Sequence, residues 1–466
     1  MIESIHLSEL ALATKGVLRG EDIAFPSVAI DTRTLTAGEL YIALQGEQFD
    51  GHQFVMQAVK KGCSSVVVSD ADLAAGLHET PCLIVDNTLY ALGECSRINR
   101  ERFSGPVVGL TGSSGKTSTK NMLESILQEQ GATCATHGNF NNEVGVPLTL
   151  LSIHDQHKFA VVEMGARKLG DIQYLSKLVQ PDVAILLNAG TAHIDIFGSQ
   201  ENIAKAKGEI FTELKQGSAA VVNFDDPAKE VWLASLQGKS ILTFSLDSAN
   251  ADIFATDIAC DDNACKFKLN YRDSKQDIHL PVPGRHNILN SLAASAAALH
   301  LGFDLAVIAT GLEKLSAVSG RLLSIPCSER LVIIDDSYNA NPASMKAALD
   351  VLALRAGFKV AVLGEMAELG DFSRKLHLEL AKYIATSMVD RVYLLGAYAT
   401  EMAELIGPKA IALESKLAIL ESLEQQDHIF DVHEHYNELV TTSILIKGSR
   451  STAMDELVEM IIKRAH

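Results

Sequence analysis

A glycine-rich turn between an apolar strand and a helix limits the fold of this chain more than any other feature. The run 111–118 reads TGSSGKTS; it follows the apolar residues Val107–Leu110 and opens a stretch of helical periodicity, Lys116–Gln130. Glycines let backbone N–H groups approach phosphate oxygens, and a helix N-terminus adds partial positive charge. We predict a phosphate-binding loop in an α/β domain, with Lys116 on the terminal phosphates and the Thr117 hydroxyl on Mg²⁺. The expected nucleotide-binding residues of the loop are Thr111, Gly112, Ser113, Ser114, Gly115, Lys116, Thr117 and Ser118.

The spacing of this loop narrows the class of enzyme. Leu110 occupies the position where the common phosphate-loop pattern has glycine, so the motif is the shorter TGxxGKT. This variant disfavours the common GTPases and kinases. It favours ATP-dependent ligases that make amide bonds through acyl phosphates.

Apolar runs alternate with helical periodicity along most of the chain, which predicts mainly parallel sheets covered by helices. Residues 252–283 instead alternate polar and β-branched side chains, as a small antiparallel sheet would. We expect three domains, at 1–85, 86–314 and 315–466, with a hinge near 312–320 at Ser316 and Gly320. The expected strands are Val66–Val68, Cys82–Val85, Val107–Leu110, Phe159–Met164, Val183–Asn188, Ala219–Asn223, Leu331–Ile334, Val360–Leu363, Val392–Leu395 and Ile444–Ile446, and the expected helices are Phe54–Lys61, Leu89–Arg102, Lys116–Gln130, Glu201–Leu214 and Asn287–His300.

The composition excludes several classes of partner. The chain has 466 residues and a formal charge of −18, which disfavours nucleic acid and anionic membranes as partners. Seven cysteines, an odd number without a CxxC pair, predict neither disulfides nor structural zinc and suit the cytoplasm. Met1–Leu10 has no basic segment typical of a signal peptide, and polar residues interrupt the apolar stretch Leu289–Leu312. We expect a cytoplasmic protein without a membrane span, and a monomer.

Ten motifs in order resemble the Mur ligases over nearly the whole chain. They are DTR at 31–33, TGSSGKTS at 111–118, GNFNNEVGVPLTLL at 138–151, EMGA at 163–166, NAGTAHID at 188–195, AKGEIF at 206–211, PGRHNILN at 283–290, DDSYNANP at 335–342, LGEMAELG at 363–370 and KGSR at 447–450. The resemblance implies an α/β fold of three domains. These are a small N-terminal UDP-substrate domain, a central phosphate-loop ATPase domain with a mainly parallel sheet plus a small antiparallel one, and a C-terminal Rossmann-like domain.

The resemblance also implies roles around the nucleotide. Glu163 lies at the end of strand Phe159–Met164 and His193 follows strand Val183–Asn188, at the strand ends where open α/β sheets bind ligands. By the resemblance, both match ligands of a second Mg²⁺. Lys207 matches a lysine that many Mur ligases carbamylate with CO₂, giving an anionic metal ligand. A loop histidine that only forms hydrogen bonds and a solvated helix lysine are the alternatives. Further matches are Asn287 for adenine and Arg321 for the γ-phosphate. By position, Asp336 at the end of strand Leu331–Ile334 suits the ribose diol, and Tyr338 suits packing on the nucleotide.

The same resemblance assigns the UDP-linked substrate, whereas the dipeptide residues are candidates by their position and charge. The UDP-linked substrate is expected at Asp31, Thr32, Arg33, Gln45, Gly46, Asp50, Gly51 and His52, with its muramoyl part at Asn139, Asn141 and Asn142. Arg33 suits a diphosphate, whereas the asparagine run also fits an ordinary turn. The dipeptide is expected at Glu365, Glu368, Lys447 and Arg450, for which surface charge is an equal alternative.

The resulting hypothesis is an ATP- and Mg²⁺-dependent ligase that adds D-alanyl-D-alanine to a UDP-N-acetylmuramoyl-tripeptide through an acyl phosphate. Lys116, Lys207, His193 and Arg321 are the expected catalytic residues. The third peptide residue can be diaminopimelate or lysine. The alternatives are a Mur ligase that adds a single amino acid, a folylpolyglutamate synthase, or a nucleotide-binding regulator that makes no bond.

Overall fold

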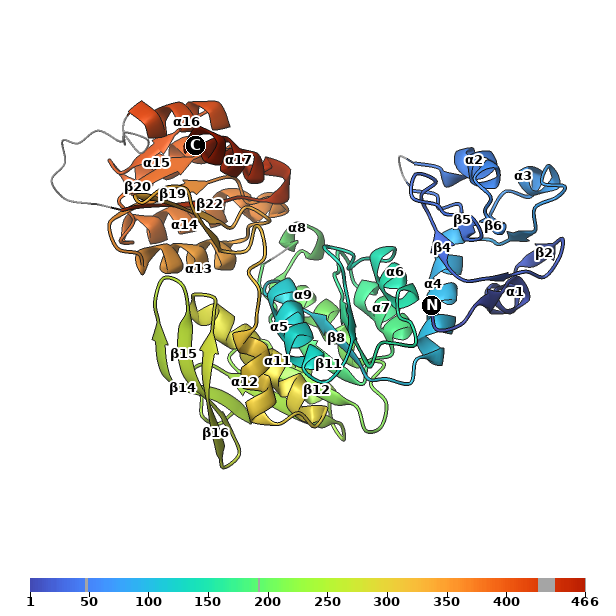
Figure 1. The fold of residues 1–466 in the computed structure, drawn as a ribbon. Helices are drawn as coiled ribbons and strands as arrows, with labels where there is room; N and C mark the ends of the chain where they lie inside the picture. Colours follow the sequence, from blue (N-terminus) through green and yellow to red (C-terminus); the bar gives the residue numbers. More distant parts are fainter. Residues whose placement is uncertain (47–48, 192, 426–440, 466) are drawn as a thin grey trace.

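A computed structural model describes residues 1–46, 49–191, 193–425 and 441–465. Its ribbon consists of three blocks, and the central block lies between the N-terminal and C-terminal ones (Figure 1). Each block contains its own main β-sheet flanked by helices, so the predicted α/β class is confirmed. In the described residues, no helix is long and apolar enough to cross a membrane.

The N-terminal block has a five-stranded sheet of order β2-β7-β6-β5-β4, parallel except at β2. A two-stranded ribbon, β1-β3, lies beside it. The elements are β1 Ile5–His6, α1 Leu7–Thr14, β2 Val17–Arg19, β3 Ala24–Phe25, β4 Val28–Ala29, β5 Leu40–Ile42, η1 Gly51–Phe54, α2 Val55–Lys60, β6 Ser65–Val68, α3 Ala71–Ala75 and β7 Cys82–Ile84. The predicted strands at 66–68 and 82–85 and the predicted helix at 54–61 are all present within one or two residues.

The central block is organised around a nine-stranded sheet of order β16-β15-β14-β13-β12-β11-β8-β10-β9. Every adjacent pair of strands from β9 along the sheet to β14 is parallel, and β14, β15 and β16 are antiparallel to one another in turn. The elements are α4 Thr88–Arg102, β8 Val107–Thr111, α5 Lys116–Gln128, β9 Thr133–Ala135, α6 Gly145–Leu151, β10 Phe159–Glu163, α7 Asp171–Val179, β11 Val183–Leu186, α8 Ile194–Phe197, α9 Gln200–Gly208, η2 Glu209–Phe211, β12 Ala219–Asn223, α10 Lys229–Ser235, β13 Ser240–Ser245, β14 Ile253–Cys260, β15 Cys265–Tyr271, β16 Ser274–Leu280, α11 Arg285–His300 and α12 Leu305–Glu313.

Two details of the central block differ from the sequence prediction. The antiparallel strands β14–β16 do not form a separate sheet, because Phe244 of β13 pairs in parallel with Ile253 of β14 and makes the sheet continuous. The helix expected over 201–214 ends at Gly208 and continues as a single 3₁₀ turn. Helical periodicity does not distinguish such a turn from a further turn of α-helix.

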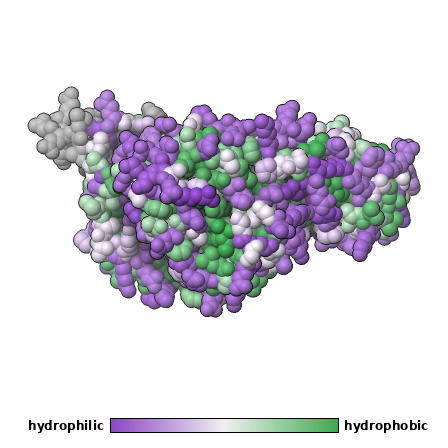
Figure 2. Space-filling view, turned by 90° about the horizontal axis from the view of Figure 1, so that it is seen from below, coloured by the Kyte–Doolittle hydropathy of each residue, from purple (hydrophilic) through white to green (hydrophobic). Residues whose placement is uncertain are grey.

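Alternating side chains of the central strands supply the core on both faces of the sheet. Val107 of β8 packs into one apolar cluster, and its neighbour Val108 packs into the other. This two-sided burial explains why the strands are continuous apolar runs. Helix α11 is rich in alanine because it lies against α5, and Gly311 of α12 crosses α5 so closely that a Cβ there would be 2.5 Å from Ile126 Cα. Seen from below, the surface is mostly hydrophilic, with hydrophobic residues gathered between its two ends (Figure 2).

The C-terminal block has a six-stranded sheet of order β17-β18-β22-β19-β20-β21, parallel except at β17. Its elements are β17 Leu323–Pro326, β18 Leu331–Asp335, α13 Pro342–Ala353, β19 Phe358–Leu363, η3 Gly370–Phe372, α14 Ser373–Ala385, β20 Arg391–Leu394, α15 Ala399–Ile406, β21 Ala410–Ala412, α16 Lys416–Gln425, β22 Thr442–Lys447, η4 Arg450–Thr452 and α17 Met454–Ala465. The four strands predicted here are present within two residues.

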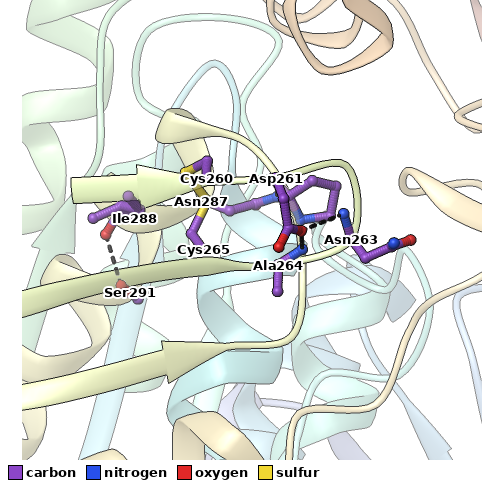
Figure 3. The surroundings of a disulfide bond; sticks show 9 residues. Cys260, Asp261, Asn263, Ala264, Cys265, Asn287, Ile288 and Ser291 are labelled. Atoms are coloured by element: carbon purple, nitrogen blue, oxygen red, sulfur yellow. Dashed lines mark hydrogen bonds between the residues drawn. A yellow bond between two sulfur atoms is a disulfide. The ribbon is translucent and has the colours of Figure 1, made fainter. Parts of the chain in front are cut away.

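The expectation that no cysteine is paired is wrong for Cys260 and Cys265, which form a disulfide at the end of the β14–β15 hairpin (Figure 3). The two residues face each other in the strand register, with Cα atoms 4.1 Å apart. The turn between them is held by Asp261, whose carboxylate accepts the backbone N–H groups of Asn263 and Ala264. Cysteine parity and CxxC spacing do not report neighbours across a hairpin, which is why the sequence argument missed this pair.

Candidate active site

The phosphate loop lies between β8 and α5, as predicted, and close packing explains its two glycines. Gly115 has a φ of 82°, and a Cβ on it would lie 2.4 Å from Oδ1 of Asn290. A Cβ on Gly112 would lie 2.9 Å from the Cβ of Leu187. A side chain at Gly115 would be strained by the positive φ and would displace the Asn290 side chain, and one at Gly112 would displace Leu187. Ser118 lies in the first turn of α5, and the Thr111 hydroxyl donates to Met164 O.

Asn188, at the end of β11, holds the shape of the loop. Its Oδ1 accepts the backbone N–H groups of Ser113 and Ser114 at 3.0 and 2.9 Å, and its Nδ2 donates to Ser114 O at 3.1 Å. Asn188 is not among the site residues predicted from the sequence. The available signal was its place at the start of NAGTAHID, directly after a buried strand.

Lys116 and Thr117 are the first two residues of α5, and their side chains form hydrogen bonds with nearby polar groups. The Lys116 ammonium donates to Gly112 O at 2.8 Å. Burial lowers the pKa of Lys116; the negative charge of Glu163 opposes this shift and the positive charge of Arg321 adds to it. The Thr117 hydroxyl donates to Glu163 Oε2 at 3.0 Å, and Asn141 Nδ2 donates to Glu163 Oε1 at 2.8 Å. The structure therefore brings together Thr117 and Glu163, which are predicted for Mg²⁺, and Asn141, which is predicted for the muramoyl part of the substrate.

The donor set around Thr117 suits Mg²⁺ in its chemistry, because hydroxyl and carboxylate oxygens are ligands that this ion prefers. Over the described ranges, no three or more His, Cys, Asp or Glu side chains gather closely enough to hold a metal ion. His193 is turned toward the C-terminal block, where its Nδ1 lies 2.9 Å from Glu368 Oε2 and lowers the pKa of that carboxyl group. No hydrogen bond or ion pair links His193 with Glu163 in the described part of the chain.

Lys207 is a cationic side chain inside the protein. It lies on α9 with 2% of its surface exposed, and within the described residues its ammonium has no hydrogen bond or ion pair. Burial, together with the nearby charge of Lys116, lowers the pKa of Lys207 to about 7. A large fraction of this side chain is therefore a neutral amine at neutral pH, the form that reacts with electrophiles. The neighbouring Lys205 is exposed.

Residues of the C-terminal block reach the phosphate loop at two points. Arg321 NH2 lies 3.5 Å from the Thr117 hydroxyl, and its guanidinium stacks on the Tyr338 ring at 4.2 Å. Asn341 Nδ2 donates to Ser114 Oγ at 2.9 Å. The predicted hinge region leads into this contact: Gly320 has a φ of 72°, and its N–H donates to Asp335 Oδ2 at 2.9 Å.

Asp336 and Asn287, expected at the ribose and the adenine, both have partners within the protein. Asp336 Oδ2 lies 2.6 Å from Lys447 Nζ, and both side chains are buried. Burial raises the pKa of Asp336 and lowers that of Lys447, while each charge opposes the shift of the other. Asn287 is buried at the start of α11, where Nδ2 donates to Pro283 O at 2.8 Å.

The C-terminal ends of β19 and β22 and the loops after them, which carry the four predicted dipeptide residues, adjoin: the Gly364 N–H donates to Lys447 O at 2.8 Å and the Ser449 N–H donates to Glu365 O at 3.0 Å. The four side chains, however, have different partners. Lys447 pairs with Asp336, and Glu368 pairs with His193. Glu365 Oε2 accepts the Ala397 N–H at 3.2 Å, and Arg450 pairs with Asp455 on the surface at 2.8 Å. Each of the four therefore has a different neighbour, and the dipeptide site stays a prediction.

The residues predicted for the UDP-linked substrate form short local contacts in the N-terminal block. Arg33 pairs with Asp31 at 2.6 Å and lowers the pKa of that carboxyl group to about 2. His52 Nδ1 lies 2.7 Å from Asp50 Oδ1, and a Cβ on Gly51 would meet Leu44 backbone atoms at 2.8 Å. Among the other predicted residues, Thr32 Oγ1 donates to Gln57 Oε1, Gln45 forms an isolated β-bridge with Asp50, and the Gly46 N–H donates to Phe49 O. Asn142 Oδ1 accepts the Gly145 N–H, and Asn139 is exposed.

Comparison with known protein families gives three matches along the chain. Residues 25–90 match the Mur ligase family catalytic domain, 110–298 match the Mur ligase middle domain, and 320–450 match the Mur ligase glutamate ligase domain. The middle-domain match begins at the phosphate loop and ends within α11. The three matches follow the order of the three blocks along the chain.

Whole-length relatives agree with these matches. A UDP-N-acetylmuramoyl-tripeptide–D-alanyl-D-alanine ligase of Escherichia coli strain K12 is 40% identical, with 98% of each chain covered. A crystal structure of MurF from Acinetobacter baumannii is similar with a TM-score of 0.91 and 36% identity, covering 99% of both chains. The MurF ligase of Thermotoga maritima in complex with ADP has a TM-score of 0.82 and 29% identity, covering 94% of this chain and 97% of that one.

Proposed function

This chain belongs to the Mur ligase family, and from that premise we propose that it joins D-alanyl-D-alanine to UDP-N-acetylmuramoyl-tripeptide with consumption of ATP. The observation that carries the proposal is the 40% identity to the Escherichia coli ligase of that name across 98% of the chain. The phosphate loop also contacts side chains of both the central and the C-terminal block, Asn188 from the first and Arg321 and Asn341 from the second, which suits a transfer between substrates on different domains. The product would be the pentapeptide precursor of peptidoglycan, with ADP and phosphate.

The proposed chemistry has two steps. The terminal carboxylate of the tripeptide attacks the γ-phosphate of ATP, which gives an acyl phosphate and ADP. The amine of D-alanyl-D-alanine then attacks the activated carbonyl carbon, and phosphate leaves as the amide forms. A carboxylate is a poor electrophile, so phosphorylation supplies the leaving group. Lys116 and Arg321 neutralise the charge that develops on the transferred phosphoryl group, and the loop N–H groups orient it.

Mg²⁺ would be held by Thr117 and Glu163, with His193 and a modified Lys207 as further ligands. When bound, it screens the phosphate charge against the incoming carboxylate. Asn141 fixes the Glu163 carboxylate through its 2.8 Å hydrogen bond, so that Oε2 stays directed at Thr117. Glu163 also raises the pKa of Lys116, because its negative charge favours the ammonium form.

Lys207 is proposed to carry a carbamate. Its neutral amine would attack CO₂ and lose a proton, so that a buried, unpartnered lysine becomes an anion. Support comes from its burial, from its pKa of about 7 and from the absence of a hydrogen-bond partner in the described ranges. An anion at this point would also offset the positive charge of Lys116, which now disfavours the Lys207 ammonium.

We also propose roles for the three domains and for the residues that would contact the nucleotide. Domains at 1–85, 86–314 and 315–466 would bind the UDP-linked substrate, ATP and the dipeptide in that order. Asn287 and Tyr338 would contact the nucleotide, and Asp336 would exchange part of its pairing with Lys447 for the ribose diol. We further propose a cytoplasmic monomer whose C-terminal domain closes over ATP through the 312–320 segment.

One incubation tests the function. The protein is mixed with ATP, Mg²⁺, UDP-N-acetylmuramoyl-tripeptide and D-alanyl-D-alanine, and the products are identified by mass spectrometry. The proposal predicts a product one water lighter than the two substrates together, with one ADP and one phosphate for each amide. ATP hydrolysis without either substrate, and without an amide, would instead indicate a nucleotide-dependent regulator.

A further inference from the structure

Asn341 uses both ends of its side-chain amide, and only one end is needed for the fold of its own helix. It is the N-cap of α13, with extended backbone angles, φ −146° and ψ 168°. Its Oδ1 accepts the Ser344 N–H at 2.9 Å, and the Ser344 hydroxyl accepts the Asn341 N–H at 3.0 Å. This capping box, followed by Pro342 in the first turn, accounts for the helix start. The Nδ2 group takes no part in it.

That Nδ2 group makes a contact with a different sheet. It donates to Ser114 Oγ at 2.9 Å, across 227 residues of sequence. The hydrogen bond of the cap fixes Oδ1, and this also fixes the orientation of Nδ2. In that orientation Nδ2 points at the phosphate loop. The α13 N-terminus is thereby attached to the residue before Gly115.

Ser114 is held from both sides. Asn188 binds its backbone N–H and C=O at 2.9 and 3.1 Å from within the central sheet, while Asn341 binds its hydroxyl from the C-terminal sheet. Gly115 and Lys116 follow Ser114 in the chain. Gly115 packs so closely against Asn290 that a Cβ on it would lie 2.4 Å from Asn290 Oδ1. A shift of Ser114 is therefore transmitted to the start of α5, where Lys116 and Thr117 are placed.

We propose that Asn341 is a positioning residue for phosphoryl transfer: by seating the α13 N-terminus on Ser114, it fixes the loop in its transfer geometry only when the C-terminal block is docked. This inference rests on the proposed ligase function. Asn341 acts through Ser114 and not by touching a substrate. Arg321 contacts Thr117 three residues further along the loop, so docking sets both ends of the 114–117 segment together.

Two variants separate the docking contact from the helix cap. Asn341→Ser keeps a good N-cap oxygen but is too short to reach Ser114. Ser344→Ala removes half of the capping box but leaves Nδ2 of Asn341 on Ser114. We expect Asn341→Ser to lower kcat about tenfold, with the KM for ATP changed less than about twofold, and Ser344→Ala to keep kcat within about twofold. Thermal midpoints are measured for both variants to compare their loss of stability.

A double-mutant cycle tests the partner. Ser114→Ala removes the acceptor, so adding Asn341→Ser to it should lower kcat by no more than about twofold further. Three outcomes overturn the inference: an unchanged kcat in Asn341→Ser, an equal loss in Ser344→Ala, or effects of the two substitutions that multiply.

A second measurement does not depend on ligation. Lys314 and Arg321 lie in the connecting segment and are trypsin sites. Addition of ATP and Mg²⁺ should slow cleavage there in the wild type and in Ser344→Ala at least about threefold more than in Asn341→Ser. If the wild type forms no amide, the proposed function fails, and the inference is then decided by this protection alone. Equal protection of the wild type and Asn341→Ser overturns it.

Discussion

The phosphate-loop edge of the central sheet and the Asp31–Arg33 edge of the N-terminal block are both polar, yet their side chains are held in different ways. At the loop, Ser114, Thr117 and Glu163 are fixed by partners from distant segments, and Lys207 is enclosed. In the N-terminal block, the Arg33 side chain is 86% exposed and pairs with Asp31, two residues away. One site is assembled by tertiary packing, and the other is a local turn with a charged side chain on it.

This difference has a physical consequence. Charges in a low-dielectric, pre-arranged site act strongly on a reacting group, whereas an exposed pair contributes little until a ligand covers it. Substitutions at the loop edge should therefore act on turnover. Substitutions at the Asp31–Arg33 edge should act on the affinity of one substrate.

The largest expected effect is at Lys116. Lys116→Ala removes the cation that lies nearest to the transferred phosphate in our proposal, and we expect turnover to fall by about 1000-fold or more. Phosphate release in the presence of both substrates measures this. Turnover close to that of the wild type would mean that the phosphates of ATP do not bind beside Lys116. The phosphate-loop edge could then not be compared with the Asp31–Arg33 edge as the site of transfer.

Lys207→Met comes next, with an expected loss of turnover of about 100-fold. The folded pKa of Lys207, about 7, lies below the ordinary lysine pKa of 10.5. Between these two pH values the unfolded chain binds one more proton than the folded chain, so the wild type loses stability as the pH falls from 10.5 toward 7. The variant lacks this penalty, so its thermal midpoint at pH 7 without bicarbonate should exceed that of the wild type, with the gap closing toward pH 10. Lys205→Met, on the exposed face of the same helix, should change neither quantity. A drop in midpoint for Lys207→Met would contradict the buried neutral amine.

A smaller effect is expected at the other edge. Arg33→Ala should raise the KM for the UDP-linked substrate about tenfold, because an exposed guanidinium gains its energy only from the bound diphosphate. The KM for ATP should stay within about twofold in initial-rate measurements. Equal increases in both constants would argue against separate sites.

The smallest expected effect is a change with pH, which should differ between turnover and the KM for the UDP-linked substrate. The amine form of Lys207 increases from pH 6 to 8, so turnover at constant dissolved CO₂ should rise several-fold over this range. Asp31 has a pKa of about 2 and stays ionised beside Arg33 throughout, so the KM for the UDP-linked substrate should change less than about twofold. A pH-dependent KM with constant turnover would reverse the expected pattern.

Local sequence predicted the parts of the molecule that depend on local physics. The strand, glycine turn and helix around 111–118 are as expected, since the apolar run, the two glycines and the helical periodicity that predict them lie side by side in the sequence. The loop clamp by Asn188 and the docking of Asn341 were missed, because each depends on strand order and on the approach of two sheets. The Lys447–Asp336 pair was missed for the same reason: a strand-end lysine looks exposed until the neighbouring strand is placed beside it.

The central claim is that the terminal phosphate of ATP is transferred to a carboxylate before the amide forms. Its most direct test uses UDP-N-acetylmuramoyl-tripeptide labelled with ¹⁸O in the terminal carboxylate, with mass spectrometry of the phosphate that is released. We predict one ¹⁸O atom in each phosphate, carried there through the acyl phosphate. Unlabelled phosphate accompanying amide formation would contradict the account.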